Sequence, residues 1–274
     1  MCRKEIVSYN IAAWKWRLSE EKYESRLTRN CEFIKKNAPQ AFIIGLQEII
    51  IGPKYYTLLQ KHFPEYKIVL PIGYDLEKNK KSAISILLIN TEGLESFSVR
   101  ELSGLKEGSA RYNFVTINTK FGCYRVLHVN IPQTMFLHNT AEWYKKNRIK
   151  LKDDFKKVIL EEATTYRDEK DVKFMLLGDM NSNTDDAFIV ALANNYNQPI
   201  YEPLIPENKN KATWRNKVVN CEGCLDHIYY SMGMMKAEDV RIHYTNIIDE
   251  SIQEELSDHT LLIGSFDASC IDEI

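Results

Sequence analysis

The feature that most constrains the fold is a series of short, strand-like segments that recurs from one end of the chain to the other. Each has at most eight residues and is rich in β-branched and aromatic side chains. The segments cover residues 5–11, 41–47, 66–71, 83–89, 96–101, 112–118, 124–131, 172–178, 227–231, 239–245 and 260–266. Such a series predicts a chain whose core is built mainly from β-sheets.

Helical patterns lie between some of these segments. Apolar residues recur every three to four positions over residues 23–34 and again, over a longer stretch, over residues 143–159. Helices separated by many strands, without strict alternation, predict an α+β fold with two packed sheets. Because no linker, low-complexity tract or repeat interrupts the pattern, we expect residues 1–274 to form a single domain.

The composition excludes several protein classes. Of the 274 residues, 44% are hydrophobic and 27% are charged, which argues against a disordered chain or a coiled coil. No apolar run is long enough for a membrane span, and the N-terminus lacks the features of a signal peptide. With six scattered cysteines, we expect reduced thiols and a cytoplasmic location. The net charge of −2 excludes a uniformly basic nucleic-acid coat but leaves room for a local patch.

Three segments place a carboxylate at the end of an apolar, strand-like run or directly before one. Glu48 ends the first and is a hard oxygen ligand suited to Mg²⁺, although a solvated strand-end Glu would look the same. Asp179 and Asn181 end the second, where a plain Asx-turn is an equal alternative to a catalytic site. Asp258 and His259 precede the last strand, where a ligand would stand beside a side chain that titrates near neutrality.

Two further polar residues lie at comparable places. Asp226 precedes the strand at 227–231, and a pairing with His259 would fix the tautomer of the imidazole and raise its pKa. Asn10 brings an amide to the end of the first strand. Each of these signals is weak alone, but their order along the chain is specific.

In that order the motifs resemble those of the endonuclease/exonuclease/phosphatase superfamily, the DNase I-like proteins. The matching segments are Ser8-Tyr9-Asn10, Leu46-Gln47-Glu48, Gly178-Asp179-Met180-Asn181, Thr213-Trp214, Leu225-Asp226-His227-Ile228-Tyr229 and Ser257-Asp258-His259. The resemblance covers nearly the whole chain. It implies a four-layer αββα sandwich, in which two packed mixed β-sheets are flanked by helices and the site lies at one rim.

The resemblance also implies a metal site. Glu48 would bind a divalent cation, Mg²⁺ or alternatively Mn²⁺, with Asn10 and Asp258 close to the same ion. Oxygen ligands of this kind are those that both ions prefer.

The remaining motif residues take catalytic roles by the same resemblance. Asp179, aided by Asn181, would orient and deprotonate the attacking water. His259, held by Asp226, would stabilise charge on the phosphoryl group. Hydrolysis of a phosphate ester needs an activated water, a Lewis acid and donors aimed at the developing charge, and this set supplies all three.

The chain departs from the family pattern at two positions. Asn130 stands where the family usually carries a phosphate-binding His, or a Tyr in abasic-site endonucleases. His128 lies two residues earlier, hence on the same face of the strand, and is a candidate substitute, with a packing or surface role equally open. Ala12 replaces an acidic residue of abasic-site endonucleases, which argues against that subgroup.

Loops beside the site would select the substrate. Arg111 and Tyr112 lie in a connection that could border it, and the Thr-Trp element brings Trp214 to the same group of substrate-binding candidates. Seven basic residues between 145 and 157 would follow a phosphate backbone or form a solvated helix face, the commoner case. The Cys-x-x-Cys at 221–224 lacks a second ligand pair, so neither a zinc nor a redox site is predicted.

The sequence therefore predicts a Mg²⁺-dependent phosphoesterase, most readily a nuclease acting on DNA or RNA. A phosphatase or phosphodiesterase for a small or lipid head-group phosphate is the alternative within the enzymes, and the modest net charge suits it. A binding module with a decayed site, suggested by Asn130, is a second alternative. We expect a monomer without an obligate protein partner; the sequence leaves open the natural substrate, endo or exo action and the physiological metal.

Overall fold

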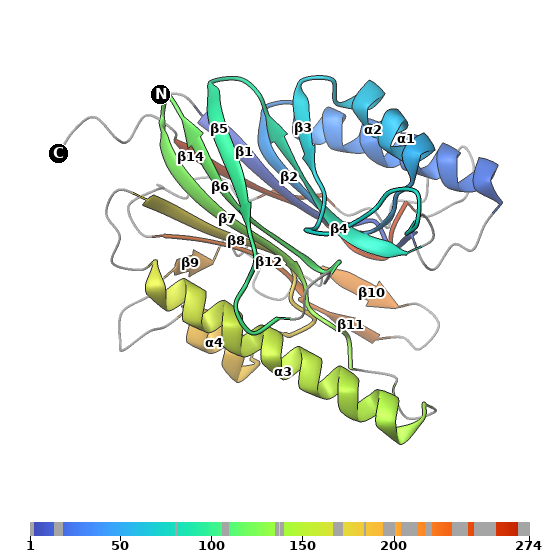
Figure 1. Ribbon diagram of the computed structural model, residues 1–274, viewed down its shortest axis with the longest axis vertical. Coiled ribbons are helices and arrows are strands. Elements are labelled where there is room, and N and C mark those ends of the chain that lie inside the picture. Colours follow the sequence, from blue (N-terminus) through green and yellow to red (C-terminus); the bar gives the residue numbers. More distant parts are fainter. Residues whose placement is uncertain are drawn as a thin grey trace.

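The eleven predicted strands are all present, and with one further strand they pair into two mixed sheets of six strands among the residues that the structure describes. The computed structural model (Figure 1) describes residues 3–13, 19–79, 82–105, 110–134, 137, 140–166, 172–183, 185–193, 201–203, 213–216, 221–231, 241–243 and 256–267. The first sheet has the order β13 (Arg241–His243), β14 (Leu261–Asp267), β1 (Arg3–Asn10), β2 (Ala41–Ile50), β4 (Ala83–Asn90), β3 (Tyr66–Val69). The second sheet has the order β5 (Leu94–Arg100), β6 (Tyr112–Thr119), β7 (Gly122–Asn130), β8 (Val172–Asp179), β12 (Asp226–Ser231), β9 (Tyr201–Pro203).

Each sheet contains one parallel pair, and a helix makes the connection that such a pair requires. In the first sheet α1 (Glu20–Asn37) joins β1 to β2, and in the second sheet α3 (Glu142–Thr165) joins β7 to β8. The remaining pairs are antiparallel. The two strands of each parallel pair therefore end at the same edge of their sheet.

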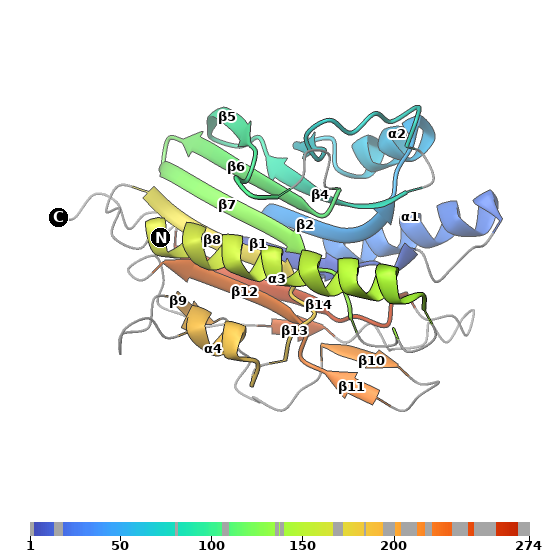
Figure 2. The same cartoon turned by 60° about the horizontal axis from the view of Figure 1, so that its bottom comes forward.

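Alternation along the strands divides the core into three apolar layers. One lies between the first sheet and its helices, one between the two sheets, and one between the second sheet and its helices. In β1, for example, Val7 and Tyr9 face α1 while Ile6 faces the second sheet. Figure 2 shows α3 and α4 (Ala187–Ala193) outside the second sheet, which gives the predicted four-layer α+β sandwich.

A few elements carry no clear sequence signal. The helix α2 (Pro53–His62) has ten residues and one fully buried side chain, Leu59, with Tyr55, Tyr56 and Leu58 partly buried against the same core, so its apolar pattern is short. The strands β9, β10 (Trp214–Asn216) and β11 (Cys221–Gly223) have three residues each, too few for alternation to show. None of the helices in the described part of the chain has the length and hydrophobicity needed to cross a membrane.

Candidate active site

The alternation that builds the inner apolar layer also delivers the polar residues of the site. In β8, Met175 and Leu177 belong to the layer between the sheets, so Asp179, two residues on, points to the same side. The same reasoning places Asp226 two residues before Ile228 in β12, and Asn10 at the end of the inner face of β1. The strands thus end their apolar inner faces with amides and carboxylates at one rim.

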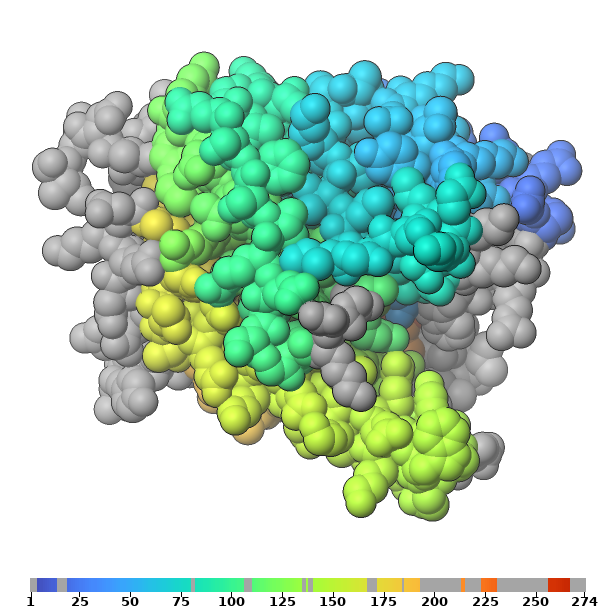
Figure 3. All heavy atoms as spheres, viewed as in Figure 1, coloured from blue at the N-terminus to red at the C-terminus, as the bar shows by residue number. Residues whose placement is uncertain are grey.

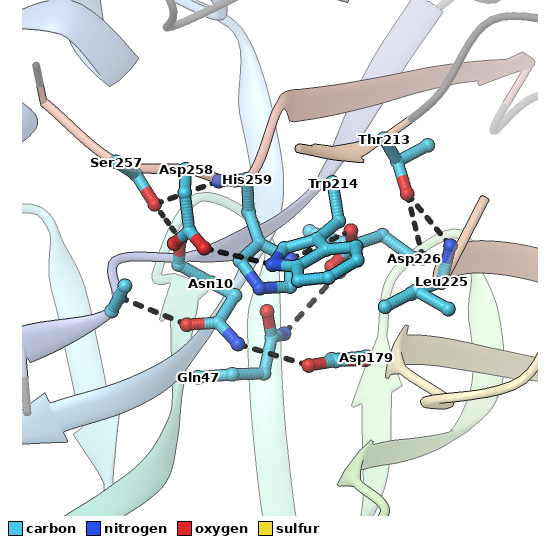
Figure 4. A network of polar contacts seen from close by, with 12 residues as sticks. Asn10, Gln47, Asp179, Thr213, Trp214, Leu225, Asp226, Ser257, Asp258 and His259 are labelled. Carbon is cyan, nitrogen blue, oxygen red and sulfur yellow. Dashed lines mark hydrogen bonds and ion pairs between the residues drawn. The ribbon is translucent and has the colours of Figure 1, made fainter. Parts of the chain in front are cut away.

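Three titratable side chains meet at this rim. Asp179, Asp226 and His259 each offer an oxygen or nitrogen atom, and these atoms lie within 4.8 Å of one another. His259 Nδ1 lies 2.9 Å from Asp226 Oδ2, the pairing that the sequence predicted. Figure 4 shows the side chains converging from β1, β8, β12 and the segment that precedes β14. All three residues are buried, so their interactions are little screened by water.

The carboxylate of Asp179 is fixed from both sides. Asn10 Nδ2 donates to Oδ2 at 3.0 Å, and the backbone N–H of Asn181 donates to Oδ1 at 2.9 Å. The second contact forms the Asx-turn that the sequence offered as an alternative to a catalytic site, and in the structure this turn orients a carboxylate of the site. Gly178 makes this geometry possible: its φ is 141°, and a Cβ there would lie 1.9 Å from the carbonyl oxygen of Val129.

Burial and charge shift the pKa values of this cluster in opposite directions. Burial raises the pKa of Asp179 to about 7, and the neighbouring charges of Asp226 and Glu48 add to the rise while His259 opposes it. Burial alone would lower the pKa of His259, but the ion pair and hydrogen bond with Asp226, together with Asp179 and Asp258, raise it to about 10. The arrangement favours a base next to a protonated imidazole near neutral pH.

Asp258 and His259 are held by their surroundings. Trp214 Nε1 donates to Asp258 Oδ2 at 2.8 Å, and its backbone forms a β-bridge with His259. Ser257 Oγ donates to the carbonyl oxygen of Asn10 at 2.6 Å and accepts from the N–H of His259 at 3.1 Å. The buried indole of Trp214 thus orients a carboxylate of the site, and its contact with substrate stays a prediction.

Backbone strain is concentrated at the same rim. Among the described residues, the non-glycine residues with positive φ are Ala12, Glu48 and Asn181, at 47°, 54° and 47°. Ala12 and Asn181 each follow the end of a strand by two residues, and Glu48 lies within β2, two residues before its end. Such conformations persist where the surrounding structure enforces them. At Glu48 the pairing of β2 with β4 also shifts register, between Leu46 and Ile49, and a bulge of this kind re-aims a side chain.

The donor set fits a divalent cation. Glu48 is half-buried, and its charge raises the pKa of Asp179 and favours the charged form of Arg111, so it faces the same space as both. Carboxylates gathered in this way repel one another, and a cation among them would relieve the repulsion. Oxygen ligands are those that Mg²⁺ and Mn²⁺ prefer.

Arg111 adjoins Asn130, the residue that departs from the family pattern. Arg111 Nη1 lies 3.4 Å from both the carbonyl oxygen and Oδ1 of Asn130, and the N–H of Asn130 donates to the carbonyl oxygen of Arg111 at 2.7 Å. Asn130 is also in register with Asp179 on the neighbouring strand. A guanidinium therefore lies beside Asn130, the position where the resemblance predicts a titratable side chain.

Two predicted site residues lie elsewhere. Tyr112 packs in the layer beneath α3, edge-on to Phe155 at 6.2 Å, so the prediction that it contacts substrate is wrong; alternation along β6 turns it away from the rim. His128 shares the inner face with Asn130 as predicted, but it is fully buried below the rim, with Nε2 at 2.6 Å from Gln47 Nε2. The structure therefore contradicts its role as a substitute for the missing His.

Several positioning residues had no assigned role in the sequence. Gln47 and Ser257 are part of the quoted motifs, and Thr213 Oγ1 accepts from the N–H groups of Leu225 and Asp226, at 2.9 Å each. Lys152 Nζ donates to the carbonyl oxygen of Asn181 at 2.6 Å. The available signal for Gln47 and Ser257 was a polar residue next to a motif acid, and for Thr213 it was the Thr-Trp step itself. Spacing cannot reveal a contact between α3 and the rim.

Comparison with known proteins shows similarity in structure rather than sequence. No family model matches the sequence, and no curated protein matches it. TDP2 from D. rerio, complexed with a single-strand DNA product, is 13% identical, with a TM-score of 0.68 over 97% of this chain and 99% of that chain. The 3′ phosphatase NExo from Neisseria, bound to a product DNA hairpin, is 15% identical, with a TM-score of 0.62 over 96% of this chain and 99% of that chain.

A third solved structure bears the name of the superfamily itself. It is an endonuclease/exonuclease/phosphatase from Bacteroides vulgatus, 15% identical, with a TM-score of 0.61 over 97% of this chain and 98% of that chain. Similarity at this level of identity establishes the fold. The resemblance predicted from the motifs is thereby confirmed for the architecture: the chain has the DNase I-like fold of the endonuclease/exonuclease/phosphatase superfamily.

Proposed function

We propose that this protein is a metal-dependent phosphoesterase that uses Mg²⁺ and cleaves phosphodiester bonds in nucleic acid. The observation that carries the proposal is the meeting of Asp179, Asp226 and His259 within 4.8 Å at a strained rim that Glu48 also borders. Acids from distant parts of the chain have no structural reason to be buried together, since burying charges without a compensating partner is costly. Such clusters mark functional sites.

Asp179 is the base in this proposal. Its carboxylate is oriented by Asn10 and by the N–H of Asn181, and a pKa raised to about 7 makes it an effective proton acceptor near neutral pH. It would take the proton of the water that attacks phosphorus. Asn181 is itself anchored, because its Nδ2 donates to the carbonyl oxygen of Ile131 at 2.8 Å.

The metal would be held by Glu48, Asn10 and Asp258, as the resemblance implies. Of these, Glu48 brings a charged carboxylate at the rim, and Asp258 brings a second that Trp214 orients. When bound, the ion supplies Lewis acidity against the negative charge that develops on the phosphoryl oxygens.

Two cationic groups would complete charge stabilisation. His259 stays protonated because Asp226 holds its Nδ1–H, which leaves Nε2–H to donate to a phosphoryl oxygen. Arg111 adds a permanent charge beside Asn130. This pair explains how a site with an amide at position 130 can still meet the demand for donors.

Nucleic acid is the favoured substrate class because two of the solved structures with this fold hold DNA products. A small or lipid head-group phosphate is the second candidate, favoured by a net charge of −2, which is unusual for a protein that binds long polyanions. The two differ in salt dependence, since contacts to a phosphate backbone release counterions and weaken steeply as salt rises.

The test is hydrolysis of bis-p-nitrophenyl phosphate with Mg²⁺, with Mn²⁺ and with a chelator, followed by a panel of single-stranded DNA, duplex DNA, abasic duplex, RNA and inositol phosphates. We expect metal-dependent turnover of the diester and cleavage of at least one nucleic acid that weakens with salt. Turnover that persists in chelator, or none with either metal, would overturn the proposal. Cleavage of inositol phosphates alone would move the substrate to the second candidate.

A further inference from the structure

The first turns of α3 extend beyond the sheet that the rest of the helix covers. Its buried residues begin at Phe155, so residues 142–150 pack little against the core. In Figures 1 and 3 this end of the helix projects from the molecule, on the side where β10 and β11 lie. Of the large hydrophobic side chains exposed among the described residues, three are here: Trp143 at 69%, Ile149 at 42% and Tyr144 at 38%. Exposed aromatic side chains that gather in this way mark a contact surface.

A stripe of side chains connects this end of the helix to the catalytic rim. Tyr144, Arg148 and Lys152 are spaced four residues apart and therefore share one helix face, spanning about 12 Å at roughly 1.5 Å per residue. Lys152 ends the stripe at Asn181 through its 2.6 Å hydrogen bond. The guanidinium of Arg148 lies 5.9 Å from the ring centroid of Tyr144, and Trp143 meets that ring edge-on at 5.9 Å and 87°.

Arg148 also lies within electrostatic reach of Arg111, so two like charges act on each other near the rim. After burial, the charge of Arg148 is the largest influence that lowers the pKa of Arg111. Arg148 Nε is buried without a hydrogen-bond partner among the described residues, and no described carboxylate forms an ion pair with Arg148. A buried, unsatisfied donor beside a like charge is costly unless a ligand completes it.

We propose that Trp143, Tyr144 and Arg148 form a nucleotide subsite for single-stranded nucleic acid next to the catalytic rim. A phosphate adjacent to the scissile one would lie between Arg111 and Arg148, and a base would stack on the exposed rings. The inference deepens the proposed function and rests on it. It favours a single strand because only unstacked bases offer a free face to an aromatic ring. Paired guanidinium groups suit a phosphate because they bind it bidentately.

The subsite is tested by binding in chelator, where no cleavage occurs. Fluorescence anisotropy would compare a short labelled oligothymidylate, an abasic single strand of equal length and a duplex. We expect the double variant Trp143→Ala, Tyr144→Ala to bind oligothymidylate about 10-fold more weakly, as the loss of one stacked base implies. Trp143→Phe should restore part of the loss. Phe97→Ala removes another exposed aromatic, 39% exposed on β5, and should leave binding unchanged.

The abasic strand separates stacking from phosphate contacts. The double variant should bind it as wild type does, whereas Arg148→Ala should weaken binding to both strands and reduce the dependence of log Kd on log salt by about one unit. A direct readout is the tryptophan emission that oligothymidylate quenches in wild type but not in Trp143→Phe. Trp143, Tyr144 and Arg148 are exposed or half-buried positions of α3, so we expect their variants to fold as wild type does. Thermal unfolding of each variant verifies this.

Failure of the subsite differs from failure of the proposed function. If wild type binds and cleaves nucleic acid but the double variant binds oligothymidylate equally well, the subsite is wrong and the function stands. Equal losses on the abasic strand would also overturn stacking. If wild type hydrolyses the small diester with metal but binds no single strand, the reaction stands while the substrate class and the subsite fall together.

Discussion

The two sheets are built alike, yet their rims carry different chemistry. The two sheets have the same succession of antiparallel and parallel strand pairs when their strands are taken in the orders β13-β14-β1-β2-β4-β3 and β5-β6-β7-β8-β12-β9. In each sheet the third and fourth strands form the parallel pair, and a helix connects them. The rim of each pair has an asparagine at the end of its first strand. Asn10 stands in register with Gln47 in the first sheet, and Asn130 with Asp179 in the second.

The difference lies in where the carboxylate is placed. The second sheet has Asp179 in register and buried, with its pKa raised to about 7. The first sheet has a neutral amide at that position and carries its carboxylate one residue further, on Glu48, which a left-handed φ of 54° turns into a half-buried place. Burial disfavours the charged form of Asp179. In the proposed mechanism the second sheet therefore supplies the base, and the first sheet, one residue past the matching position, supplies a ligand for the cation.

The largest effect should come from removing the base. Asp179→Asn makes the second rim resemble the first, with two amides in register. Because positioned proton transfer contributes roughly 10²–10⁴ to rate, we expect kcat on bis-p-nitrophenyl phosphate to fall at least about 100-fold. Asp185→Asn, which neutralises an exposed carboxylate near α4, is the matched control and should retain full activity. A rate for Asp179→Asn within a few-fold of wild type would refute the role of Asp179.

The next effect concerns the backbone that carries Asp179. Gly178→Ala forces a Cβ against the carbonyl oxygen of Val129 at 1.9 Å and into a φ of 141°, so we expect a loss of about 3 kcal/mol in unfolding free energy. Gly73 has a positive φ of 74° with nothing within 4 Å of its would-be Cβ. Gly73→Ala therefore introduces backbone strain without the clash and should lose about 1–2 kcal/mol. Urea unfolding measures both, and equal losses would contradict the close approach of β7 and β8.

The third prediction addresses the first sheet. Glu48→Gln keeps the shape of the side chain and removes its charge. Loss of a residue that only supports a metal ligand typically weakens affinity roughly 10–100-fold, so loss of a ligand should raise the Mg²⁺ concentration for half-maximal activity at least about 10-fold. Glu65→Gln is the control, because Glu65 is exposed and precedes Tyr66, which pairs with the end of β4 opposite to the end beside Glu48. If excess Mg²⁺ fails to restore any activity to Glu48→Gln, Glu48 does more than hold the cation.

Sequence reasoning succeeded where a local pattern determines structure and failed where a partner decides. Strand periodicity correctly located eleven strands of the described part of the chain. The polar residues at strand ends identified Asp179, Asp226 and His259, which converge in the structure. It misplaced Tyr112 because a shift of one residue along β6 exchanges the two faces of the sheet. The contact of Lys152 with Asn181 depends on how α3 packs across β8, which no spacing within the helix encodes.

His128 illustrates the same limit, since the sequence predicted the face on which it lies but left open whether it packs in the core or reaches the site. It lies where the two sheets meet: a Cβ on Gly45 of the first sheet would come within 2.9 Å of His128 Nε2. Gln47, the counterpart of Asp179 in the first sheet, contacts this buried imidazole. Gln47, which takes the register position of Asp179 in the first sheet, thus contributes a contact between the two sheets.

The last prediction tests this contact through pH. Burial lowers the pKa of His128 to about 3, whereas in the unfolded chain it takes up a proton near its ordinary 6.5. Between these values the unfolded state binds one proton more, so the contribution of His128 to stability is complete above pH 6.5 and declines as pH falls towards 3, by about 1.4 kcal/mol per unit. His128→Gln removes this dependence, so the difference between wild type and variant in urea unfolding should shrink steadily from about pH 6.5 to about pH 5. A constant difference over that range would mean that His128 is accessible to protons in the folded protein, as a rim residue would be.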